Sequence, residues 1–90
     1  MLMSWKKTHD EKRFMSWKRG KTSINVEWNP ISEDWTVVYY RKGLWNPWFK
    51  KPVHFATRKE AITFALKEMK KKKFKIDKKL QVPYSKRKNS

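Results

Sequence analysis

The chain has 90 residues and a net charge of +16, from 24 Lys and Arg against eight Asp and Glu. A chain of this length forms one small domain with a limited core. Because it has no Cys, it has no disulfide, thiolate metal site or cysteine nucleophile. Like charges repel one another in a compact state, so this excess of positive charge predicts a polyanionic partner.

The beginning of the chain has no apolar run of the length found in signal peptides, and no stretch is long enough to span a membrane. These features and the absence of Cys predict an intracellular protein of the cytoplasm or nucleoid, with no membrane partner.

Residues 1–20 have no clear periodicity. Leu2, Trp5 and His9 would share one face of a helix, but Phe14 and Trp17 do not continue that face. We expect a short helix or an irregular N-terminal arm here.

Two strands are predicted next. Residues 22–28 alternate between apolar and polar side chains, which is typical of a half-buried strand, and a turn follows from Pro30 to Asp34. Residues 35–42, from Trp35 to Lys42, consist mainly of residues that favour strands. Both faces of this second strand are apolar, so the pattern alone leaves open which face is buried.

An aromatic loop bounded by prolines is expected over residues 44–52, and a short third strand over 53–56. Thr57 and Glu60 form a capping box, in which the Thr hydroxyl accepts from the Glu60 amide and the Glu60 carboxylate reaches back. A helix with an apolar face should follow, ending in a run of lysines. The residues of that face are Ala61, Ile62, Ala65, Leu66 and Met69.

These elements predict an α+β fold in which a three-stranded antiparallel sheet packs on one C-terminal helix, with basic arms at both ends. The expected organisation is an N-terminal arm or short helix over residues 1–20, a core domain over 21–74 and a basic C-terminal arm over 75–90. One face of such a sheet stays open and could bind a partner.

The stretch from Trp35 to Gly43, followed by a third strand and by Phe55 to Ala61, resembles the AP2-type DNA-binding domain. It is also similar to the arm-binding domain of tyrosine recombinases. The resemblance covers about residues 22–70. It implies that the outer face of a three-stranded sheet lies in the major groove of duplex DNA. The residues that would then approach DNA are Asn25, Glu27, Arg41 and Lys42.

The sequence contains no motif of a known catalytic or metal site. The two histidines, His9 and His54, are far apart in the chain, and the His9-Asp10-Glu11 run is better interpreted as a solvated turn than as a metal site. We therefore expect no enzyme activity, no metal and no cofactor.

Each Trp has two interpretations, because Trp serves both as a core residue and as a stacking surface for bases. Trp28 and Trp35 flank the first turn, so cross-strand packing is favoured. Packing and contact are about equally expected for Trp45 and Trp48 in the loop. Docking of the N-terminal segment is slightly favoured over stacking on bases for Trp5 and Trp17.

Positive charge is concentrated near the C-terminus, where residues 67–90 hold eleven Lys and Arg and two acids. Only five of the 24 basic residues are Arg, the usual reader of guanine, so we expect contacts to the nucleic-acid backbone with modest sequence specificity. The predicted binding residues are Arg41, Lys42, Trp45, Trp48, Lys50, Lys51, Lys70, Lys71, Lys72, Lys73, Lys75, Lys78 and Lys79.

The predicted function is thus non-catalytic nucleic-acid binding, with duplex DNA favoured because of the resemblance. Single-stranded DNA or RNA, or a ribosome-associated role, is the first alternative, because exposed aromatic residues among basic ones suit unstacked bases. A small phage-like regulator that binds an acidic host protein is the second. Binding to a membrane surface is disfavoured, because no helix has a wide apolar face.

Overall fold

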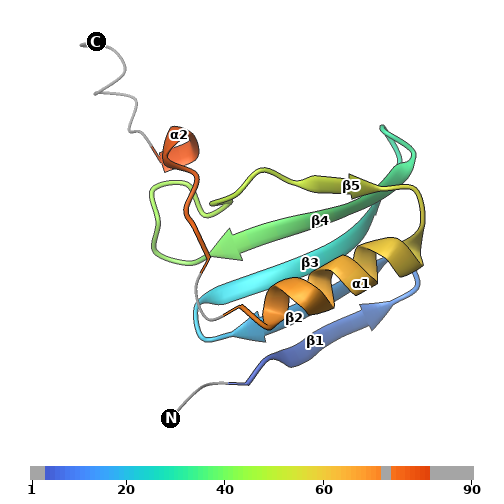
Figure 1. Ribbon diagram of the computed structural model, residues 1–90, viewed down its shortest axis with the longest axis horizontal. Coiled ribbons are helices and arrows are strands. Elements are labelled where there is room, and N and C mark those ends of the chain that lie inside the picture. The colour runs from blue at the N-terminus through green and yellow to red at the C-terminus, as the bar shows by residue number, and fades with distance from the viewer. Residues whose placement is uncertain (1–3, 72–73, 82–90) are drawn as a thin grey trace.

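The computed structural model of the chain describes residues 4–71 and 74–81. In this part of the chain, the strands β1 to β5 form one antiparallel meander in the order β1-β2-β3-β4-β5, and the helix α1 lies across one face of it (Figure 1). The predicted α+β class is confirmed, but the sheet has five strands where three were expected. The elements are β1 (Lys6–Glu11), β2 (Phe14–Arg19), β3 (Thr22–Asn29), β4 (Asp34–Arg41), β5 (Val53–Phe55), α1 (Arg58–Met69) and α2 (Lys78–Gln81).

The two additional strands come from the N-terminal segment, where the prediction of a short helix or an irregular arm is wrong. β2 pairs with β3 over its whole length, and a two-residue turn joins them, with Gly20 at a φ of 61°. Glycine adopts positive φ readily, which such a turn requires. β1 is an edge strand with every residue exposed, and its charged side chains and a bulge between Lys7 and His9 protect that edge from pairing.

The pairing of β3 with β4 decides which face of β4 is buried. Val37 lies opposite Val26, and Tyr39 lies opposite Ile24, so these four side chains point to the same face, against α1. The neighbouring residues of β4, including Tyr40, point to the other face, which no helix covers within the described residues. The turn between the strands is stabilised by Asn29, whose side-chain oxygen accepts hydrogen bonds from two backbone amides of the turn.

The loop between β4 and β5 closes the edge of β4. β5 pairs only with the first half of β4, and the remaining edge is covered by the loop, where the Arg41 amide donates to the Pro47 carbonyl at 2.7 Å. The next two residues of the loop go to opposite sides of the sheet. Trp48 packs edge-on against Tyr40 on the uncovered face, and Phe49 packs against Tyr39 on the covered face.

The helix α1 begins as predicted at Thr57, whose hydroxyl accepts from the Glu60 amide at 3.2 Å. The Glu60 carboxylate accepts from the Thr57 hydroxyl at 2.9 Å, where a bond from the Thr57 amide was predicted. The predicted apolar face is partly wrong, because Leu66 is 46% exposed and Glu68 is buried. The helix packs on β3, β4 and β5 through its small residues Ala61 and Ala65, which let it approach the sheet closely.

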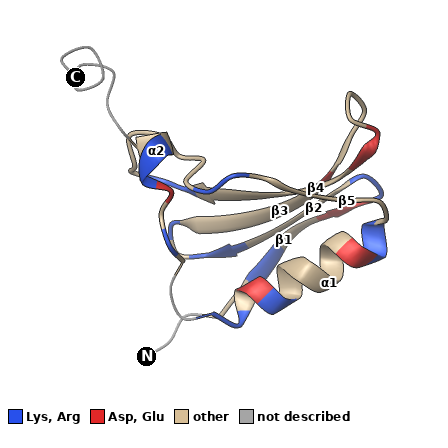
Figure 2. Ribbon diagram, turned by 45° about the horizontal axis from the view of Figure 1, so that its top comes forward, with Lys and Arg blue, Asp and Glu red and all other residues tan. Residues whose placement is uncertain are grey.

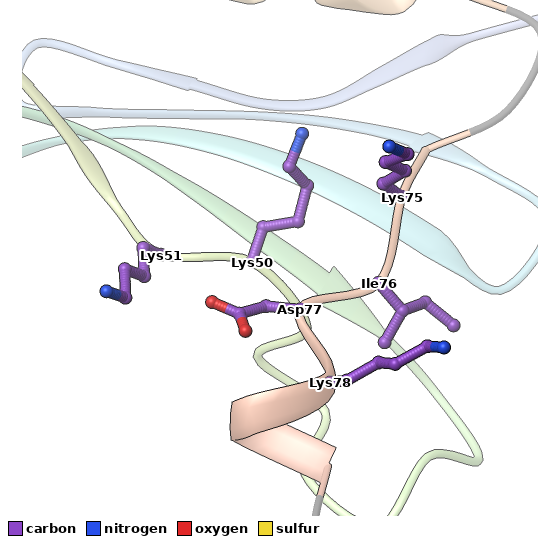
Figure 3. A pocket seen from close by; sticks show the side chains of 6 residues that line it. All are labelled: Lys50, Lys51, Lys75, Ile76, Asp77 and Lys78. Carbon is purple, nitrogen blue, oxygen red and sulfur yellow. The ribbon is translucent and has the colours of Figure 1, made fainter.

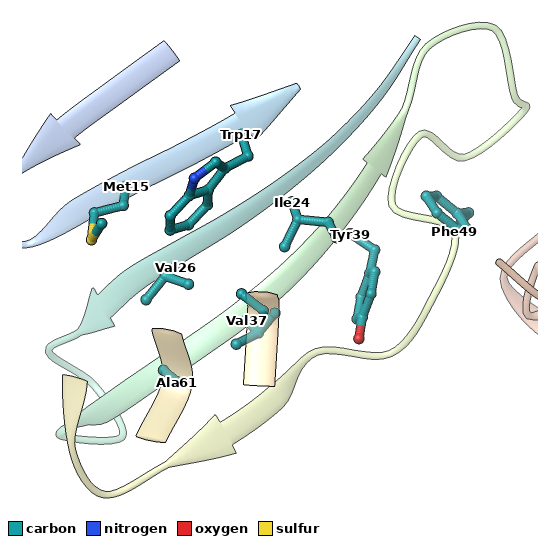
Figure 4. Close-up of a cluster of buried hydrophobic side chains, with 9 residues drawn as sticks. Met15, Trp17, Ile24, Val26, Val37, Tyr39, Phe49 and Ala61 are labelled. Atoms are coloured by element: carbon teal, nitrogen blue, oxygen red, sulfur yellow. The ribbon is translucent and has the colours of Figure 1, made fainter. Parts of the chain in front are cut away.

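The core lies between α1 and the sheet and extends toward the loop that precedes β5 (Figure 4). Beyond the end of α1 it continues as an aromatic cluster in which Phe74 contacts Trp5, Tyr39 and Phe49. The Trp5 indole also donates to the Met69 carbonyl at 2.9 Å, which ties the N-terminal segment to the end of α1. The fully or nearly buried apolar residues are Met15, Trp17, Ile24, Val26, Val37, Tyr39, Phe49, Ala61 and Ala65.

Residues 74–81 lie against the loop between β4 and β5 and do not extend away as an arm. The Asp77 amide donates to the Phe49 carbonyl at 2.7 Å. The Gln81 side chain makes two hydrogen bonds to the backbone of Asn46, at 2.6 and 3.2 Å. This segment therefore brings its lysines next to those of the loop. The rest of the predicted basic arm, residues 82–90, lies outside the described residues.

Candidate nucleic-acid interface

Charge is unevenly distributed between the two ends of the sheet (Figure 2). One end holds the turns that follow β1 and β3 and the start of α1, and there Asp10, Glu11, Glu33 and Asp34 offset the nearby Lys and Arg. We call the opposite end the basic end. Lys and Arg gather there on the start of β1, the end of β2, the β2–β3 turn, the end of β4 and the turn after it, the β4–β5 loop, the end of α1 and residues 74–81. They include Lys6, Lys18, Arg19, Lys21, Arg41, Lys42, Lys50, Lys51, Lys70, Lys71, Lys75, Lys78 and Lys79.

A shallow hollow of about 470 Å³ lies at the basic end, between the β4–β5 loop and the segment before α2 (Figure 3). Four lysines line it with a single carboxylate, and this excess of positive charge would attract an anion such as a phosphate group. Its lining residues are Lys50, Lys51, Lys75, Ile76, Asp77 and Lys78.

The buried carboxylate of Glu68 holds two of the predicted binding lysines. Its oxygens lie 2.6 Å from the Lys71 ammonium and 3.9 Å from that of Lys50, and one accepts from the Tyr39 hydroxyl at 2.5 Å. Burial alone would raise the pKa of Glu68, but the hydrogen bonds from Lys71 and Tyr39 and the charges of both lysines hold that pKa below its usual value. Burial, and then the bond to Glu68, raises the pKa of Tyr39. Lys50 also packs over the Tyr39 ring, so these two lysines have structural contacts as well as charge.

The other predicted binding residues are exposed at the basic end, within the part of the chain that the structure describes. Arg41 is the last residue of β4 and is in register with Thr22, so it belongs to the covered face. Lys42 lies in the turn after β4, where a strand residue was predicted. Lys72 and Lys73 lie outside the described residues. Apart from Lys71, the exposed lysines among the predicted binding residues are Lys42, Lys51, Lys70, Lys75, Lys78 and Lys79.

Some tryptophans are packed inside the protein and others are exposed to solvent. Trp17 is 7% exposed in the core, and Trp28 packs edge-on against Trp35 across the strands, as predicted. By contrast Trp45 is 56% exposed and Trp48 is 46% exposed, so the loop presents two large aromatic surfaces to solvent at the basic end.

The uncovered face of the sheet has three rows of side chains that run across the strands. They are, in order, the basic row of Lys6, Lys18, Ser23 and Tyr40, the middle row of His9, Ser16, Asn25 and Val38, and the acidic row of Glu11, Phe14, Glu27, Thr36 and His54. The basic row ends at Tyr40, against which Trp48 packs. The acidic row is about 13 Å away from the basic row along the strands.

The acidic row is the negative part of this face. Burial raises the pKa of Glu27 on this row. Beside it, Asp34 accepts from the Ser32 hydroxyl at 2.6 Å and lies 3.2 Å from His54, contacts that lower the pKa of Asp34. In residues 4–71 and 74–81, no three His, Asp or Glu side chains lie close enough together to hold a metal ion.

Sequence reasoning missed Lys6, Lys18 and Tyr40 as candidate binding residues. The first two were assigned to an arm without regular structure, and Tyr40 belonged to a strand whose buried face was undecided. The alternation Met15-Ser16-Trp17-Lys18 was a signal that could have identified β2 and its outward residues.

Comparison with protein-family models, with curated proteins and with solved structures finds no match to this chain. The resemblance to AP2-type domains thus stays a prediction. In the described part of the chain, neither helix has the length and apolar character needed to cross a membrane.

Proposed function

We propose that this protein binds nucleic acid without catalysis, and that the basic end contacts the phosphate backbone. The observation that carries this proposal is the basic end itself, where the β4–β5 loop and residues 74–81 place four lysines around one hollow. Most of these lysines are exposed and separated from the acids at the other end of the sheet. Lysine contacts neutralise phosphates and release counterions without reading bases, so the binding is expected to tolerate many sequences.

Duplex DNA is the form that the family resemblance implies, and single-stranded DNA or RNA is the alternative. Fluorescence anisotropy with duplex DNA, single-stranded DNA and duplex RNA, each over a series of salt concentrations, tests the proposal. We expect affinity to fall steeply with salt and to a similar degree for unrelated sequences.

Two double variants locate the contact. Lys75→Gln with Lys78→Gln removes two lysines of the hollow and should flatten the salt slope by about one unit for each lost phosphate contact. Lys12→Gln with Lys59→Gln removes the same charge at the opposite end and should leave the slope nearly unchanged. Equal effects of the two pairs would contradict a localised interface. Absence of binding to any nucleic acid at low salt would contradict the function and point to an acidic protein as partner.

A further inference from the structure

We propose that a single, unpaired strand of nucleic acid crosses the uncovered face of the sheet along the basic row, from Lys6 and Lys18 to Tyr40 and Trp48. This inference rests on the proposed function and specifies the form of nucleic acid and its path. The row runs across four strands spaced about 4.8 Å apart, so it is about 14 Å long, the length of a few nucleotides.

The two ends of this path supply the two contacts that an unpaired strand needs. Lys6 and Lys18 are exposed, lie opposite each other on β1 and β2, and can neutralise phosphates. At the other end the rings of Tyr40 and Trp48 are 4.9 Å apart and inclined by 67°. Such a pair leaves ring surface on which a base can stack, and stacking is open only to bases that are not already stacked in a duplex.

The acidic row argues against a duplex on the same face. A major groove is about 12 Å wide, so the two backbones beside it are separated by at least that distance. If one backbone followed the basic row, the other would lie over the acidic row, about 13 Å away along the strands. There the carboxylates of Glu11 and Glu27 would repel its phosphates. A single strand on the basic row avoids this repulsion, and its bases would lie over the middle row, where Asn25 offers a side-chain amide.

The test is binding of the full chain to three labelled probes of about 12 nucleotides, a length typical of single-strand sites. The probes are an oligothymidylate, an oligouridylate and a mixed-sequence DNA duplex. Tyr40→Leu with Trp48→Leu should weaken binding of the single strands at least tenfold, because stacking contributes about 1–3 kcal/mol per base, and should change binding of the duplex less than about twofold. The ratio of the two single strands shows whether the DNA or the RNA probe is preferred.

A second variant keeps the inference testable if the aromatic variant folds poorly. Glu11→Gln with Glu27→Gln removes the repulsive row and should raise the affinity for the duplex more than that for the single strands. As a matched control, Lys75→Gln with Lys78→Gln should weaken single strands and duplex alike, because the hollow is not on this face.

Loss of single-strand and duplex binding to the same degree in the Tyr40 and Trp48 variant would overturn the path. An unchanged ratio of the two affinities in the Glu11 and Glu27 variant would overturn it as well. In either case nucleic-acid binding that still depends on Lys75 and Lys78 would leave the proposed function standing. If the unaltered protein binds none of the probes, both proposals fail.

Discussion

Trp48 and Phe49 are neighbours in the chain, yet they lie on opposite faces of the sheet and in different surroundings. Phe49 is fully buried against Tyr39 and Phe74 on the face that α1 and residues 74–81 cover. Trp48 packs edge-on against Tyr40, and nearly half of it is exposed. The same contrast holds for the whole sheet, because the covered face is apolar and closed, and the uncovered face is polar and ordered by charge. Whether a large aromatic residue of this chain serves as a core residue or as an exposed surface therefore depends on the face of the sheet on which it lies.

The largest expected effect comes from the most direct test of that contrast. Phe49→Ala should lower the free energy of unfolding by about 4 kcal/mol, because it leaves a cavity in the aromatic cluster. Trp48→Ala, the matched change one residue earlier, should cost less than about 1.5 kcal/mol, because its side chain is half exposed. Urea unfolding followed by circular dichroism measures both. Similar losses for the two variants would show that the faces do not differ in this way.

The buried carboxylate on the covered face gives the next effect. Glu68→Ala should destabilise the protein by about 2 kcal/mol, because it leaves the buried Tyr39 hydroxyl without its partner. Lys71→Ala removes a more exposed partner of the same carboxylate and should cost less than about 1 kcal/mol. Urea unfolding also measures the loss of stability in these two variants. A larger loss for Lys71→Ala than for Glu68→Ala would contradict a central role for Glu68.

The pH dependence of stability should also reflect the ionisation of the Glu68 carboxylate. The folded-state pKa of Glu68 is below its usual value of 4.5, so its stabilising contribution is complete above that value and is lost as the pH falls through the folded-state pKa. Asp34 has a lowered pKa and acts in the same direction. Glu68→Gln should therefore flatten the fall in melting temperature below pH 4.5. A curve parallel to that of the unaltered protein would argue against this linkage.

The uncovered face should give the smallest effect, with the opposite sign. Burial raises the pKa of Glu27, so the folded state binds this proton more tightly than the unfolded state does, and ionisation costs stability above the usual pKa of 4.5. Glu27→Gln should thus raise the free energy of unfolding at neutral pH by less than about 0.5 kcal/mol, because the side chain is partly exposed. The gain should vanish in acid, where Glu27 is protonated in both states. A gain that persists at low pH would have a different origin.

The parts of the fold that depend on neighbouring residues were predictable. The alternation of residues 22–28, the strand that begins near Trp35 and the helix start at Thr57 each appear where local pattern and capping chemistry place them. The N-terminal hairpin was missed because β1 has no apolar face and is held by its pairing with β2. Leu66 was assigned to the apolar face of the helix and Glu68 was not, because helix periodicity does not locate the partners Tyr39 and Lys50 that hold the Glu68 carboxylate.

For the candidate site, composition and chain order were enough to show the amount of charge, its lysine-rich character and the aromatic residues among the lysines of the loop. Tertiary structure decided which of these groups come together. The hollow needs the loop and residues 74–81 to be joined, and the rows need the register of β1 to β4. Composition does not depend on the fold, and a capping box joins residues that are close in the sequence, so both can be recognised without the structure. Strand register and the face that a side chain occupies are set by pairing and burial between residues far apart in the chain.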